Sequence, residues 1–249
     1  MLWWTIGVSA LIGITVMAYK ALGDHIKELD SSFSGITSSA GSFFGGSDFF
    51  SPIGYLSSQI YYILLPLLLI IMIMTLVSSL LRHDEDDATV ELTLARAITR
   101  KRLLFAKALA GIVIISIVCI LSYLVTFLAV KAANIDINQW HLLLTHVLTF
   151  AFSLSFGVIG FALVAVSRLT RKLAMPVAII VSFGGYVISS LAGFVSWLEQ
   201  PAKFIPYHYF DTTALLNGHV GSGLVVYLVG TLLVGSLIAA IGYSRRDIG

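Results

Sequence analysis

Residues 82–107 read RHDEDDATVELTLARAITRKRLLFAK and lie between two long apolar runs. Eleven of the chain's 28 acidic and basic residues fall in these 26 positions. Acidic residues occupy positions 84–87, and the basic residues Arg96, Arg100, Lys101, Arg102 and Lys107 follow them. A segment this polar is too costly to place in hydrocarbon, so it must face water between two membrane spans.

The composition of the whole chain agrees with this interpretation. It is 58% hydrophobic with a mean hydropathy of +0.95, and only 11% of its residues are charged, whereas soluble domains carry about 25%. These values are typical of a polytopic membrane protein. The net charge of +2 gives no indication of nucleic-acid binding, and the single cysteine, Cys119, excludes a disulfide framework within the chain.

Apolar segments long enough to cross a membrane recur along the chain, and a spanning helix needs about 20 residues. Backbone polar groups in lipid must be satisfied internally, so we expect helices. The sequence predicts an all-α polytopic membrane protein that forms one transmembrane domain over residues 1–249. We read the first span as a retained anchor, because no Lys or Arg precedes it and no cleavage site follows it. The six predicted spans are about 2–19, 53–81, 103–130, 142–167, 173–197 and 222–243.

Basic residues fix the predicted orientation. Eleven of the fifteen Lys and Arg residues lie in 82–107, 168–172 and 245–246, and the other connections carry the remaining four. The positive-inside rule therefore places these three segments and both termini in the cytoplasm of a multi-pass plasma-membrane protein. The connections 131–141 and 168–172 are short, so spans three, four and five should run as antiparallel neighbours.

Two predicted external segments differ in character. The loop 20–52 is rich in Ser, Gly and Phe, and can be a flexible linker or an external gate that touches lipid. In the segment 198–221, Tyr207, Tyr209 and Phe210 are suited to the membrane interface. Asp211 and Asn217-Gly218 are start and stop signals for a short interfacial or re-entrant helix between spans five and six.

The charged segment 82–102 contains a predicted amphipathic helix over 89–102. At helical spacing, Val90, Leu94, Ala97 and Ile98 share one stripe. The helix dipole would favour acidic residues before this helix and basic residues after it, and the basic residues would also anchor span three at an anionic leaflet. Neither explanation accounts for the apolar stripe, which needs lipid or a partner protein to cover it. A metal site at His83 is disfavoured, because consecutive carboxylates cannot all turn toward one ion.

These motifs resemble those of type-2 ABC transporter permeases. Residues 85–107 resemble the cytoplasmic stretch of that family through Thr89, Glu91, Leu92, Ile98, Thr99, Arg100 and Lys107, although Ala88 and Ala97 stand where Gly and Pro are usual. The segment 204–211, FIPYHYFD, resembles the Phe-x-Pro-Phe-x-Tyr-Phe-Asp motif of the family and supplies Pro206, Tyr209, Phe210 and Asp211. The ending at 243–247, YSRRD, is also similar.

The resemblance implies the transport subunit of an exporter rather than an enzyme. No Gly is followed by Lys, so the chain lacks a phosphate-binding Gly-x-x-x-x-Gly-Lys motif, and ATP with its Mg²⁺ would bind to a separate ATPase subunit. Two permeases, identical or different, would pair with two ATPases. The family similarity makes 89–102 a coupling helix, with contacts expected from Val90, Glu91, Leu94, Ala97, Ile98 and Arg100.

Polar residues inside the spans leave two interpretations open. Gln59 and His146 can line a substrate path or make interhelical hydrogen bonds. Pro66 and Pro176 are candidate kink positions in spans two and five. Two other functional classes also remain: an ATPase-driven complex that transmits force without moving a substrate, and an intramembrane protease, which would need a nucleophile and a base within the spans.

Overall fold

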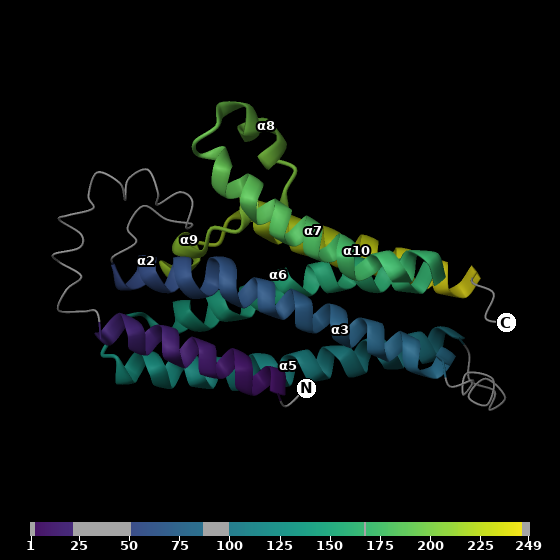
Figure 1. Ribbon diagram of the computed structural model, residues 1–249, viewed down its shortest axis with the longest axis horizontal. Coiled ribbons are helices and arrows are strands. Elements are labelled where there is room, and N and C mark those ends of the chain that lie inside the picture. The colour runs from purple at the N-terminus through teal and green to yellow at the C-terminus, as the bar shows by residue number, and fades with distance from the viewer. Residues whose placement is uncertain (1–2, 22–50, 87–99, 167, 246–249) are drawn as a thin grey trace.

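The computed structural model describes residues 3–21, 51–86, 100–166 and 168–245, and every regular element within these ranges is helical (Figure 1). Six helices in the described residues are long and apolar enough to cross a membrane. They confirm the predicted all-helical fold with six spans. The spans are Trp3–Ala21, Pro52–Leu80, Arg102–Ala132, Gln139–Ala165, Leu173–Ala192 and Ser222–Gly242.

The second span is built from three consecutive helical segments, namely α2 (Pro52–Leu56), the π-helical segment η2 (Ser57–Leu64) and α3 (Leu65–Asp86). Ser51 caps the start, because its Oγ accepts a hydrogen bond from the Gly54 N–H at 3.0 Å. The π-helical segment ends at Leu64, two residues before Pro66. Proline has no N–H to donate, and its ring clashes with the carbonyl one turn earlier in a helix. Such segments often occur at functional positions in helices.

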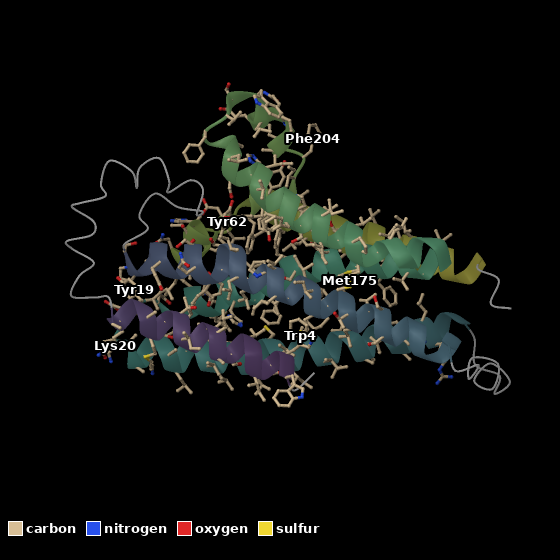
Figure 2. All side chains as sticks on the ribbon, in the orientation of Figure 1. Trp4, Tyr19, Lys20, Tyr62, Met175 and Phe204 are labelled. Carbon is tan, nitrogen blue, oxygen red and sulfur yellow. The ribbon has the colours of Figure 1, made fainter. Side chains whose placement is uncertain are left out.

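Helix α6 (Gln139–Val166) is the centre of the bundle. It contacts α3, α5 (Arg100–Ala132), α7 (Arg168–Ala192) and α10 (Ser222–Arg245). The first helix, Trp3–Ala21, lies along α5 at the lower edge of Figure 1. Its end is tied to α5 by Lys20, labelled in Figure 2, whose Nζ donates to the Ala132 carbonyl at 2.6 Å.

Helix boundaries differ from the predicted ones near the fifth span. Residues 168–172 form the first turn of α7 instead of a loop, since Arg and Lys are good helix formers. The same helix ends at Ala192, before Gly193 and five residues earlier than predicted, and glycine weakens a helix.

The acidic residues 84–86 lie in the last turn of α3. A helix C-terminus carries partial negative charge, so the dipole does not favour them there. The helix predicted to follow them lies outside the described residues, so an effect of its dipole on their order stays a prediction.

The predicted coupling residues Val90, Glu91, Leu94, Ala97 and Ile98, and the loop residues 22–50, lie outside the described residues. Arg100 is the first residue of α5. We call the end of the bundle where α3 ends and α5 begins the linker end. The opposite end, which carries residues 196–221, is the motif end.

Candidate functional site

Residues 196–221 fold into four short helices at the motif end: η3 (Ser196–Leu198), α8 (Glu199–Ala202), η4 (Pro206–Tyr209) and α9 (Thr212–Leu216). Pro206 is the first residue of η4, where a fixed φ and a missing N–H are tolerated. Asp211 caps α9, and its Oδ1 accepts from the Ala214 N–H at 2.9 Å. The segment is therefore built from local capping signals that the sequence already shows.

Gly218 ends α9 in the left-handed conformation, with φ at +86°. The His219 N–H donates to the Ala214 carbonyl at 2.8 Å, and the Gly218 N–H donates to Leu215 at 2.9 Å. These two bonds form a Schellman cap. A Cβ at this position would also lie 2.5 Å from Nε2 of His141 in α6, so conformation and space both require glycine.

The aromatic side chains of the segment divide into two groups. Tyr207 and Phe210 are 3% and 1% exposed, whereas Tyr209 is 40% exposed and donates its hydroxyl to the Lys203 carbonyl at 2.8 Å. The prediction of interfacial side chains was wrong for Tyr207 and Phe210, which are buried inside the bundle. Burial raises the pKa of the Tyr207 phenol above its usual value, so its hydroxyl stays protonated.

The two buried rings join an aromatic cluster drawn from several spans. Phe210 stacks on Phe152 of α6 with centroids 4.2 Å apart and planes inclined by 4°. The Tyr207 ring lies 6.0 Å from both Tyr62 and Tyr186, which belong to η2 and α7. Tyr62 is labelled in Figure 2 at the place where the second span meets this cluster. Such ring pairs contribute about 0.5–1.5 kcal/mol each beyond their buried area.

Hydroxyl groups make a second link between the motif and span two. Ser57 Oγ lies 2.6 Å from Thr212 Oγ1 and 2.8 Å from Thr213 Oγ1. Ser57 begins the π-helical segment, and both threonines open α9. The same span that leads to the charged segment is thus hydrogen-bonded to the motif.

His146 lies at the meeting point of three spans and is 0% exposed. Its Nε2 is 3.0 Å from Ser122 Oγ of α5, and its Nδ1 is 3.4 Å from the Tyr61 hydroxyl of η2. A Ser–His pair at this distance resembles a nucleophile and its base. Ser122 is also 0% exposed, so no substrate reaches the pair in this conformation, and its geometry is that of an interhelical hydrogen bond.

Gln59 is partly exposed on η2. Among the described residues, one apolar cavity lies between α3, α5, α6 and α10, and another lies between the first helix and α5. Neither Gln59 nor His146 lines them, and a path-lining role for either residue stays a prediction.

An apolar six-span bundle with a folded segment on one end defines a multi-pass helical membrane protein. The family model described as ABC-2 family transporter protein matches residues 1–247. The chain therefore belongs to the ABC-2 transporter family and is a membrane permease. No curated protein and no solved structure matches it.

Proposed function

We propose that the chain is the permease subunit of an ATP-driven exporter, which forms the substrate path and couples to a separate ATPase. The observation that carries this proposal is the family match over residues 1–247 on a six-span helical bundle. Two permeases and two ATPases form the complex, and ATP with Mg²⁺ binds in the partner subunits. The permease lies in the plasma membrane with its linker end in the cytoplasm, because the basic residues at that end favour this orientation.

The contacts of span two support a route for coupling. α2, η2 and α3 follow one another without interruption from Pro52 to Asp86, and residues 87–102 follow directly. At the other end, Ser57 contacts Thr212 and Thr213 of α9. An ATPase that displaces residues 89–102 would therefore act on the motif end through one span, and the π-helical segment is a place where the register of that span can change.

Docking on the ATPase is tested by the double variant Leu94→Asp with Arg100→Glu. Leu94→Asp places a charge on the apolar stripe, which helix-in-groove recognition would use. Arg100→Glu reverses the charge of a basic residue in the same segment. The ATPase should be lost on co-purification while the permease remains in the membrane fraction. A matched control is Lys203→Glu with Phe204→Asp at the motif end, where Phe204 is 91% exposed. Equal ATPase recovery with both double variants would refute the docking surface.

A force-transmitting complex is the second candidate, and the direct link between span two and the motif favours it. The two candidates differ in whether vesicle contents change. Inverted membrane vesicles containing the permease and ATPase are incubated in cell extract, which bathes their outward-facing cytoplasmic side, and their contents are compared with and without ATP by mass spectrometry. ATP-dependent accumulation of a compound supports export, and ATP hydrolysis without any accumulation supports force transmission.

A further inference from the structure

Residues 193–205 form a side arm at the motif end. The arm begins directly after Ala192, the last residue of span five, and Figure 1 shows its helix α8 standing away from the side of the bundle. The arm therefore lies beside the spans, close to the depth at which span five leaves the hydrocarbon. Around a membrane protein, lipid headgroups occupy this depth.

One side of the arm faces the protein, and another is aromatic. Its helices η3 and α8 are consecutive, and the Phe204 N–H donates to the Pro201 carbonyl at 3.1 Å, so residues one helical turn apart share a side. Leu198 and Ala202 are 8% and 1% exposed and face the bundle. Trp197 and Phe204 lie two turns apart on a second side, where they are 72% and 91% exposed. Figure 2 shows Phe204 on the outer surface of the arm.

The third side of the arm is polar. Glu199 and Lys203 are exposed there, one turn apart. They are the only charged residues in 193–205, so the net charge of the arm is zero. A helical segment with an aromatic side and a charged side is typical of one that lies in the plane of the membrane interface. Tryptophan is enriched at that interface, because its ring is apolar while its N–H can reach water.

Contacts with the motif and with span five fix the direction in which the aromatic side faces. The Tyr209 hydroxyl donates to the Lys203 carbonyl at 2.8 Å. A Cβ at Gly185 of α7 would lie 2.9 Å from Cγ2 of Ile205, so the arm also packs closely on span five. The arm is thus held to the bundle along its protein side, and its aromatic side is left outward.

We propose that the side arm is a membrane anchor, which places Trp197 and Phe204 among the lipids of the leaflet at the motif end. The polar side of the arm stays in the aqueous part of the interface. The anchor does not select a headgroup, because the net charge of the arm is zero. The interfacial position that the sequence predicted for Tyr207 and Phe210 belongs instead to Trp197 and Phe204.

The neighbouring helix α7 indicates why lipid is the occupant. Along the span, α7 exposes Ile180 and Phe183 by 68% and 52%, and the arm extends from the end of this helix. The lipid layer that covers the helix therefore continues to the arm. Water in place of lipid would leave two large aromatic side chains unburied, which the hydrophobic effect disfavours.

The test uses the full chain in phosphatidylcholine vesicles, with Trp197 as its only tryptophan after Trp3, Trp4 and Trp140 are replaced by Phe. Bromine on the lipid chains quenches a tryptophan that touches lipid, and iodide on both sides of the vesicles quenches one that water reaches. Trp197 should lose most of its emission to lipid brominated near the headgroup and less to lipid brominated near the chain end. Added phosphatidylglycerol should not change this result. Quenching by iodide alone would place Trp197 in water, and quenching by neither reagent would place it under a second copy of the chain. Either result overturns the proposal.

Moving the tryptophan distinguishes the sides of the arm. With Trp197 also replaced by Phe, Phe204→Trp should be quenched by brominated lipid as Trp197 is. Glu199→Trp, on the polar side of the same helix, is the matched control and should be quenched mainly by iodide. Equal quenching of the two variants by lipid would overturn the assignment of the sides. Size-exclusion chromatography, with the emission in unbrominated vesicles, checks that each variant is folded. The vesicles contain no ATPase and no substrate, so the result does not depend on the proposed function.

Discussion

Gly157 on α6 gives a direct test of how tightly span two is held in the bundle. A Cβ at this position would overlap Cγ2 of Ile73 in α3. Ile73 is 0% exposed and β-branched, and such residues keep essentially one χ1 rotamer in a helix. Cγ2 therefore cannot move aside, and the two helices must separate to admit a methyl group.

The cost of Gly157→Ala follows from these contacts. Overpacking a core costs about 1–3 kcal/mol, and the better helix propensity of Ala returns at most about 1 kcal/mol. We expect a net loss of about 1 kcal/mol, or roughly a fivefold change in the unfolding equilibrium constant. Gly160→Ala should cost less, because a Cβ there meets the flexible end of Met74. Gly230→Ala should be neutral or stabilising, since nothing lies within 4 Å of its Cβ.

Reversible unfolding in mixed detergent and SDS, followed by circular dichroism, measures the free energy of unfolding of these three variants. Ile73→Ala provides a second check, because it removes the obstructing Cγ2 and leaves a cavity. In that background, Gly157→Ala should cost at least about 1 kcal/mol less than in the wild type, which a double-mutant cycle reports. If Gly157→Ala unfolds like Gly230→Ala, or if the cycle shows no coupling, the close contact between α3 and α6 is refuted.

Two further predictions concern the motif end. Ser57→Ala removes both hydroxyl contacts to α9 and should speed amide exchange in α9 about fivefold, since a hydrogen bond contributes about 1 kcal/mol. Ser58→Ala, whose hydroxyl bonds within its own span, should leave exchange unchanged, and an equal effect of both variants would contradict the link. Gly218→Ala should cost about 1–2 kcal/mol from the left-handed conformation alone, with more from the His141 ring, and should expose the end of α9 to exchange. Gly221→Ala is the control and should leave amide exchange in α9 unchanged, because nothing lies within 4 Å of its Cβ. Full protection of α9 in Gly218→Ala would count against the Schellman cap.

The six spans could be predicted because lipid leaves few alternatives for an apolar run of about 20 residues. The residues at which the helices begin and end were predicted less accurately. Residues 168–172 read as a loop because they are polar, yet polarity does not prevent Arg and Lys from continuing a helix. Likewise, the acidic residues 84–86 extend α3, and nothing local to them marks a helix end before Asp86.

The start and end of α9 were visible in the sequence at Asp211 and Gly218, because capping depends on neighbouring residues. The burial of Tyr207 and Phe210 was not, since it depends on Phe152, Tyr62 and other rings distant in sequence. One signal was available. The two residues are three positions apart next to a proline, and in a 3₁₀ turn positions i and i+3 lie on the same side. That spacing separates them from Tyr209, which remains exposed.

Span two is held differently along its length, and this bears on the proposed coupling. At the motif end it is fixed by the hydrogen bonds of Ser57 and by the aromatic cluster around Tyr62. Near its middle, Ile73 packs directly against Gly157. Toward the linker end, Leu76, Val77 and Leu80 border the 610 Å³ cavity, and side chains beside a void lose contacts on that side. These three side chains therefore have fewer packing contacts on the side that faces the cavity. Under the proposed function, a push from the ATPase on residues 89–102 would meet the cavity beside Leu76, Val77 and Leu80 before it meets the close contact between Ile73 and Gly157.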